Sequence, residues 1–391
     1  MTFPNGFLWG ASTAAHQIEG GNVNSDWWQR EHGHLAGPPV EAPSGDAADS
    51  YHRYREDMQL LADAGLTSYR FSIEWARIEP EEGFVSRAAL DHYRRMVATA
   101  VELGLTPMVT LHHFTNPIWF ARAGGWKDAG SVERFARYVE HALPVLDGVE
   151  LVCTINEPNM VAVLADPDQG FPAVGLPAGD PLVTEHLIAA HRRAVTILQA
   201  AGKKAGWSVA TQAYQAEPGA EEVTEEYGRS REHVFLETSI NDDWVGIQAY
   251  TRTRVGADGP LPIDDDAERT LTGWEYYPSA IEDGIRNSWQ RNGVPVYVTE
   301  NGIATADDSR RIDYTRGALE AVSRTIDDGI DVRGYLHWSA LDNYEWGSYR
   351  PTFGLIAWDA ATFERHPKPS LGWLGSVAKA NGLLEAAQAS L

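Results

Sequence analysis

The stretch Val294-Pro295-Val296-Tyr297-Val298-Thr299-Glu300-Asn301-Gly302 decides how this chain folds. Its β-branched and aromatic residues run into a single carboxylate, and the chain then reaches Asn301-Gly302, a pair typical of a turn. An apolar run of this length with a turn at its end is typical of a buried parallel strand. The pattern therefore predicts that Glu300 lies where this strand ends, at the carboxyl edge of a parallel sheet.

A second stretch, Leu151-Val152-Cys153-Thr154-Ile155-Asn156-Glu157-Pro158, has the same form, and proline stops it after Asn-Glu. In a closed parallel barrel such strand ends meet at one mouth, so Glu157 and Glu300 can face each other there. Two facing carboxyl groups suit glycoside hydrolysis, in which one protonates the leaving oxygen and the other attacks the anomeric carbon or activates a water. The alternative is that each glutamate only accepts hydrogen bonds from backbone amides in a turn.

Strands and helices alternate along the rest of the chain. We expect strands at residues 7–12, 68–75, 107–114, 151–157, 206–210, 243–250, 294–300 and 332–338. We expect helices at residues 47–64, 86–103, 132–146, 181–201, 277–292, 308–328 and 371–384. The Gly- and Pro-rich segment 22–46 is expected to be a loop, and segment 166–180 a loop over the mouth. The alternation has no linker or composition break, so it predicts an α/β fold, a single (β/α)8 TIM barrel that occupies residues 1–391 as one catalytic domain.

Composition excludes several classes of partner. The chain has 391 residues, with 55 acidic and 32 basic side chains and a net charge of −23, whereas nucleic acids and anionic membranes require basic patches. The N-terminal residues 1–6 show no basic start before an apolar run, and no stretch approaches the roughly 20 apolar residues of a membrane span. We therefore expect a cytoplasmic protein that binds neither nucleic acid nor membrane. The single cysteine, Cys153, excludes an internal disulfide and is expected to be a small buried side chain.

No metal or cofactor is expected. His32-Gly33-His34 has no cysteine or carboxylate ligands beside it, and His112 and His113 point to opposite faces of their predicted strand. A metal-dependent barrel hydrolase would require His and Asp ligands at several strand ends. Arg70 lies inside a predicted barrel strand, where an unpaired charge is unfavourable. Its partner is expected to be a carboxylate such as Glu300, or else an acidic residue lower in the barrel.

These residues resemble glycoside hydrolase family 1, the β-glucosidases and β-glycosidases, over nearly the whole chain. Thr154-Ile155-Asn156-Glu157-Pro158 resembles the acid/base motif of the family, and Val298-Thr299-Glu300-Asn301-Gly302 resembles its nucleophile motif. Four further segments are similar, at residues 7–20, 69–72, 243–251 and 338–346. Six matches in the order of the family make the resemblance specific.

The resemblance implies that Glu300 is the nucleophile, that Glu157 is the general acid/base, and that Arg70 and Tyr250 hold Glu300. The family retains the anomeric configuration through a covalent glycosyl-enzyme intermediate, for which two carboxyl groups lie about 5 to 5.5 Å apart. We expect the charge of Glu300 to raise the pKa of Glu157. The implied substrate is a terminal β-D-glucoside, galactoside or fucoside, as a small-molecule glycoside or short oligosaccharide. The implied sugar-binding residues are Gln17, His113, Asn156, Tyr250, Trp338, Glu345 and Trp346, with Trp338 as the stacking floor.

The chain departs from the family pattern in places. Gln248-Ala249-Tyr250 stands where Asn-Tyr-Tyr is usual, which leaves the role of Gln248 open. Phe114 replaces a frequent tryptophan, and Thr352 a common arginine. The chain is also shorter than is usual for the family, notably between residues 212 and 242, so we expect a more open or differently shaped aglycone site.

Two alternative functions remain. A branch of the family that hydrolyses 6-phosphoglycosides has serine at the position of Glu345, which would repel a phosphate, although Arg350 is close in sequence. A catalytically silent sugar-binding barrel would need a stacking floor but no poised nucleophile, and the presence of Arg70 with both glutamates argues against it. The choice among glucose, galactose and fucose, and the oligomeric state, stay open at this level.

Overall fold

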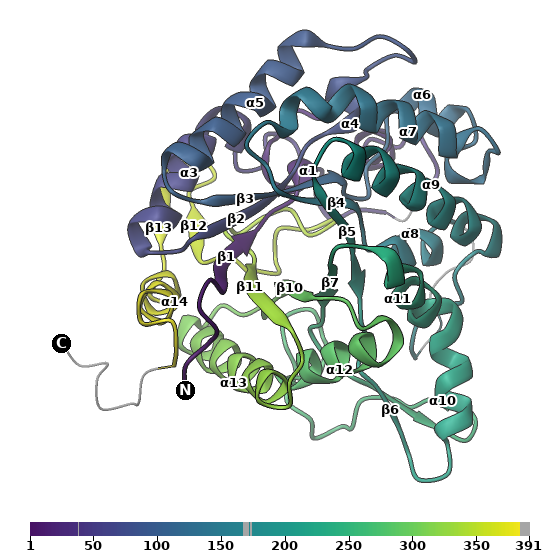
Figure 1. Cartoon of the computed structure of the whole chain (residues 1–391), viewed down its shortest axis with the longest axis vertical. Helices are drawn as coiled ribbons and strands as arrows, with labels where there is room; N and C mark the ends of the chain where they lie inside the picture. Colours follow the sequence, from purple (N-terminus) through teal and green to yellow (C-terminus); the bar gives the residue numbers. More distant parts are fainter. Residues whose placement is uncertain (38, 167–171, 173, 384–391) are drawn as a thin grey trace.

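Eight parallel strands close into a barrel with helices around it, as Figure 1 shows for the computed structural model, which describes residues 1–37, 39–166, 172 and 174–383. Each barrel strand pairs with the next one along the chain, and the last pairs with the first. This confirms the predicted (β/α)8 fold class. The strands are β1 (Leu8–Ser12), β2 (Ser68–Ser72), β3 (Thr106–His112), β4 (Leu151–Asn156), β5 (Lys204–Ala210), β7 (Val245–Gln248), β10 (Val296–Asn301) and β11 (Val332–Trp338).

Long amphipathic helices surround the barrel and follow the predicted ranges closely (Figure 1). The 132–146 segment changes from α-helix to a 3₁₀ turn, η2 (Leu143–Leu146), where Pro144 lacks an amide hydrogen. The last helix ends earlier than predicted, because Asn381 takes a left-handed conformation with φ 47°. The long helices are α3 (Ser50–Ala64), α5 (Arg87–Glu102), α7 (Ser131–Ala142), α9 (Pro181–Ala200), α12 (Ala280–Asn292), α13 (Asp308–Asp327) and α14 (Pro369–Ala380).

The segment between β5 and β7 differs from the prediction, which placed no helix there. It contains α10 (Glu221–Gly228), a π-helical turn (Arg229–His233), α11 (Val234–Thr238) and the 3₁₀ turn η4 (Ser239–Asn241). The π turn rotates the buried face of the helix, so apolar residues do not recur with the period of one straight helix. For this reason periodicity failed to reveal it.

Segment 22–46 also differs from the prediction of a loop, because it contains α2 (Asp26–Glu31). The Ser25 hydroxyl begins this helix by accepting a hydrogen bond from the Trp28 amide at 3.1 Å. A helix of under two turns carries too short a pattern to stand out among the glycines and prolines that follow. The predicted loop over the mouth falls partly on residues 167–171 and 173, outside the described residues.

Short helices and small sheets decorate the strand ends. The short helices are α1 (Ala15–Ile18), α4 (Trp75–Ile78), α6 (Ile118–Arg122), η1 (Gly125–Lys127) and α8 (Pro158–Val163). The small sheets are formed by β6 (Tyr214–Ala216), β8 (Thr253–Gly256) and β9 (Gly259–Pro260), and by β12 (Ile356–Trp358) and β13 (Arg365–Pro367). Within the described ranges, none of the helices combines the length and apolar character that crossing a membrane requires.

The barrel interior is apolar towards the amino-terminal ends of the strands and polar towards their carboxyl ends. Met108, Leu151, Cys153, Trp244, Tyr297 and Leu336 form the apolar cluster, in which Cys153 is buried as expected. The polar layer includes Arg70, Asn156, Gln248 and Glu300, all at or near strand ends and all buried. The interior of the barrel is therefore a core at one end and a site at the other.

A buried ion pair connects α3 to the β12–β13 hairpin, and its removal should destabilise the protein. Arg365 Nε lies 2.7 Å from Asp57 Oδ1, with both side chains almost fully buried. We expect Arg365→Leu to lower the free energy of unfolding by about 3 to 5 kcal/mol, because Asp57 would stay buried without its partner. Urea unfolding would measure this loss.

The matched control is the double variant Asp57→Leu/Arg365→Leu, which leaves no unpaired charge and should lose less than the single variant. A double variant as unstable as the single one would show that packing of the Arg365 side chain, not its charge, is what matters.

Candidate active site

Glu300 is held by two donors at the carboxyl end of β10. Its Oε1 accepts a hydrogen bond from Arg70 Nη1 at 2.6 Å, and its Oε2 accepts one from the Tyr250 hydroxyl at 2.7 Å. Burial raises the pKa of Glu300, while the charge of Arg70 and the hydrogen bonds from Tyr250 and Arg70 act against that rise. Because Arg70 is fully buried and permanently cationic, its partner is best matched as a carboxylate.

The sequence suggested that Gly302 serves a turn after Glu300, but the structure gives this glycine a different role. The strand continues to Asn301, and Gly302 does not adopt a left-handed conformation. A Cβ at Gly302 would lie 2.0 Å from the carbonyl oxygen of Trp338, so glycine is required by the close approach of the two chains. The Asn301 side chain donates to the carbonyl of Ala249 at 2.6 Å and fixes β10 against the chain that follows β7.

Glu157 follows β4 directly and is the N-cap of α8, in which Pro158 occupies the first turn. Its backbone is left-handed, with φ 46°, and its amide donates to the Ser208 carbonyl at 2.7 Å. Burial raises the pKa of Glu157 well above the ordinary value, and the negative charge of Glu300 raises it further. Arg70 and Tyr250 donate hydrogen bonds to Glu300 and stabilise its charged form, so we assign the proton to Glu157.

Asn156 connects the groups beneath the two glutamates. Its Oδ1 accepts hydrogen bonds from Arg70 Nη2 at 2.5 Å and from Gln248 Nε2 at 2.8 Å. The sequence left the role of Gln248 open, and the structure shows that its longer side chain reaches Asn156. Asn156 Nδ2 lies 3.1 Å from His113 Nε2, which accepts the hydrogen bond because burial holds the pKa of His113 well below its usual range.

One cavity of about 370 Å³ contains both glutamates. Of the predicted sugar-binding and catalytic residues, Asn156 lies behind the wall with Arg70, and the others line the cavity. Those that line it are Gln17, His113, Glu157, Tyr250, Glu300, Trp338, Glu345 and Trp346. His112, which points the other way, bonds to Asn116 at 3.0 Å and is structural.

Glu345 and Gln17 lie in the part of the cavity wall near Trp338. The Trp338 indole donates to Glu345 Oε1 at 3.2 Å, and burial raises the pKa of Glu345 to about 8. Gln17 Nε2 donates to the Tyr344 carbonyl at 2.8 Å, whereas its buried Oε1 has no partner among the described residues. Buried polar atoms without partners are unfavourable, so this wall is suited to a ligand that brings hydroxyl groups.

The sequence missed several residues that line the cavity. These come from the end of β5, from the short helices α2 and α8, and from loops: Trp27, Met160, Leu164, Ala210, Thr211, Gln212, Trp274 and Phe353. The sequence carries no signal of which segments after the strands converge on one mouth, so these residues could not be assigned to the site. Phe114 lines the cavity too, with its ring centroid 5.0 Å from that of Trp346.

Among the residues described, no group of three or more His, Cys, Asp or Glu side chains is arranged to hold a metal ion. His32 and His34 bond instead to the Trp28 carbonyl and the Gln29 side chain.

Comparison with known proteins assigns the family. The profile described as glycosyl hydrolase family 1 matches residues 1–255 and 244–383. The chain belongs to this family. A 1,4-β-D-glucan glucohydrolase of Thermotoga neapolitana is 32% identical, with 98% of this chain and 99% of the relative covered. That alignment spans 448 positions, more than the length of this chain, so the relative has residues that this chain lacks.

Two further relatives agree with the assignment. A bifunctional β-D-glucosidase/β-D-fucosidase of Bifidobacterium breve is 33% identical, with 95% of this chain and 97% of the relative covered. The crystal structure of a β-glycosidase superimposes with a TM-score of 0.89 at 44% identity and covers 99% of both chains. The chain is therefore an O-glycosyl hydrolase by family.

The coupling of the two glutamates gives a test by titration. Glu300→Gln should lower the pKa of Glu157, because it removes the negative charge that opposes ionisation. The pKa should remain above the ordinary value, since burial, the larger cause, is unchanged. A ¹³C NMR titration of protein labelled at the glutamate carboxyl carbons would measure both values.

Glu345→Gln is the matched control, because Glu345 also raises the pKa of Glu157 but contributes less than Glu300. The coupling is wrong if the two variants shift the pKa of Glu157 equally, or if neither does.

Proposed function

We propose that this chain is a retaining β-glycosidase that hydrolyses terminal non-reducing β-D-glucosides, with residues 1–391 acting as one catalytic domain. The observation that carries the proposal is the placement of two buried carboxyl groups in one cavity, with Arg70 and Tyr250 bound to only one of them, Glu300. Glu300 is held ionised by Arg70 and Tyr250, and Glu157 retains its proton. A nucleophile and an acid in these states are what the first step of a double displacement requires.

In the first step, Glu300 attacks the anomeric carbon while Glu157 transfers its proton to the glycosidic oxygen. The bond between the anomeric carbon and that oxygen breaks, the aglycone leaves as an alcohol, and the sugar remains as an ester of Glu300. The ester carries no charge, so the pKa of Glu157 falls and Glu157 can act as a base. Glu157 then takes a proton from a water molecule that attacks the anomeric carbon. The ester bond to Glu300 breaks, and the sugar leaves with its anomeric configuration retained.

The sugar-binding wall supports the choice of glycone. The Trp338 ring offers an apolar face to a pyranose, and Gln17, His113 and Glu345 offer polar groups for its hydroxyls. The relatives are named for activity on glucan, glucoside and fucoside substrates. We infer a small β-glycoside or short oligosaccharide as the substrate, with glucosides and fucosides both accepted.

A 6-phosphoglycosidase is disfavoured. Glu345 lines the cavity at the position where the 6-phosphoglycosidase branch has serine, and it offers no cation to a phosphate. Arg350, the nearest cation in sequence, bonds to Glu41 and is 82% exposed, and it does not line the cavity. A silent sugar-binding barrel is disfavoured by the ion pair of Arg70 with Glu300, since binding alone gives no reason to bury a poised nucleophile.

The decisive experiment is NMR of the anomeric proton during hydrolysis of a panel of aryl β-glycosides: glucoside, galactoside, fucoside and 6-phosphoglucoside. The first sugar released should be the β anomer, with the glucoside and fucoside cleaved best. Glu300→Gly should lose activity by more than about a thousandfold, because no nucleophile remains, and azide or formate should restore part of it. A first product in the α form, or an active Glu300→Gly variant, would contradict the mechanism.

A further inference from the structure

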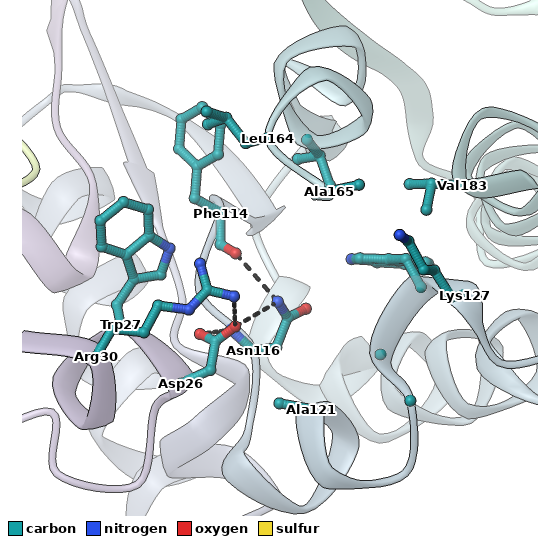
Figure 2. Close-up of a pocket in the computed structure, with 14 residues that line it drawn as sticks. Asp26, Trp27, Arg30, Phe114, Asn116, Ala121, Lys127, Leu164, Ala165 and Val183 are labelled. Carbon is teal, nitrogen blue, oxygen red and sulfur yellow. Dashed lines mark hydrogen bonds and ion pairs between the residues drawn. The ribbon is translucent and has the colours of Figure 1, made fainter. Parts of the chain in front are cut away.

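A second cavity, of about 180 Å³, adjoins the active-site cavity and is shown in Figure 2. Trp27, Phe114 and Leu164 line both cavities, so the two share a wall. The second cavity also borders α8 through Val161, and Glu157 is the N-cap of α8. It therefore lies on the side of the mouth where Glu157 protonates the leaving group, which is the aglycone side.

Two cations line this cavity in a chain that is strongly acidic overall. Figure 2 shows Arg30 and Lys127 on opposite sides of it, and Asp26 is the single acidic residue among those that line it. Arg30 Cζ lies 5.6 Å from the ring centroid of Trp27, and Arg30 Nη2 lies 3.6 Å from Asp26 Oδ2, which is long for a hydrogen bond. Lys127 Nζ lies 3.2 Å from Asp180, outside the cavity lining.

The side-chain acceptors of the cavity are already occupied. Asp26 Oδ1 accepts a hydrogen bond from the backbone amide of Asn116 at 2.9 Å, and Asp26 Oδ2 accepts one from Asn116 Nδ2 at 3.1 Å. Asn116 Oδ1 in turn accepts from His112 Nε2 at 3.0 Å. Figure 2 shows the bonds between Asp26 and Asn116 as dashed lines. Each side-chain acceptor of this lining thus already has one protein donor.

The donors, by contrast, are free. Arg30 Nε and Trp126 Nε1 are both buried and have no hydrogen-bond partner among the described residues. Trp126 is only 6% exposed, so water does not readily supply the missing acceptor. The cavity thus combines unsatisfied donors with a guanidinium, that of Arg30, whose ion pair with Asp26 is long at 3.6 Å, and Trp27 and Phe114 add aromatic surface.

We infer that this cavity is an aglycone subsite that binds an oxyanion, and that the enzyme prefers β-glycosides whose aromatic aglycone carries a carboxylate. The inference rests on the proposed function, because it assigns the leaving-group side by the position of Glu157. A carboxylate brings acceptors only, which match the free donors, and the planar guanidinium of Arg30 suits its geometry. A neutral aglycone would bring no charge to balance the guanidinium of Arg30.

The test compares two substrates that differ in charge and hardly in shape or leaving group: para-(carboxymethyl)phenyl β-D-glucoside and its amide, para-(carbamoylmethyl)phenyl β-D-glucoside. The wild-type enzyme should cleave the acid with the higher kcat/KM, and added salt should reduce the preference. Arg30→Gln should lower the acid-to-amide ratio about tenfold, and Trp126→Phe should lower it less. Arg94→Gln, which removes an exposed cation on α5, is the control and should leave the ratio unchanged.

A binding measurement separates this inference from the proposed function. Calorimetric titration with free para-hydroxyphenylacetate and its amide should show tighter binding of the acid, and Arg30→Gln should abolish the difference. If neither glucoside is hydrolysed but this difference holds, the proposed function fails and the subsite stands. Equal kcat/KM values for acid and amide in the wild type would overturn the subsite. So would an equal loss on both substrates in Arg30→Gln, which would mean that Arg30 only holds α2 in place.

Discussion

The buried ion pair between Arg70 and Glu300 is the constraint on which the rest of the site depends. Removing both charges from water is unfavourable, and the pair persists because its polar atoms have further partners. Tyr250 bonds to the second oxygen of Glu300, and Asn156 accepts from Arg70. Burial raises the pKa of Glu157, and the charge of Glu300 adds to that rise, so the ion pair with Arg70 couples the two carboxyl groups.

The barrel makes this arrangement possible by separating its two tasks along the strands. Met108, Cys153 and Leu336 fill the lower interior with apolar side chains, while the strand ends hold the polar groups. Arg70 and Glu300 are 230 residues apart in the chain, yet closure of the sheet places β2 and β10 around one mouth. Stability and chemistry thus depend on different layers of the same strands.

In the proposed mechanism, specificity for the aglycone depends on the segments after the strands. The helix α2 presents Trp27 to both cavities, and α8, which Glu157 caps, presents residues to both as well. The proposed acid and the proposed aglycone surface are therefore neighbours at one short helix. A change in these loops can alter the accepted aglycone without moving the barrel strands that hold Glu157 and Glu300.

The sequence by itself determined the alternation of strands and helices and the placement of Glu157 and Glu300 after two buried strands, because these features follow from local periodicity and from proline and glycine at strand ends. Only the tertiary structure decided that Gln248 bonds to Asn156, that His113 rather than His112 faces the cavity, and that α2 forms a second cavity with the chain after β3. Those features depend on contacts between residues far apart in sequence, which no local pattern encodes. The helices α2, α10 and α11 escaped prediction because they are short or interrupted by a π turn, and their conformation is fixed by what they pack against.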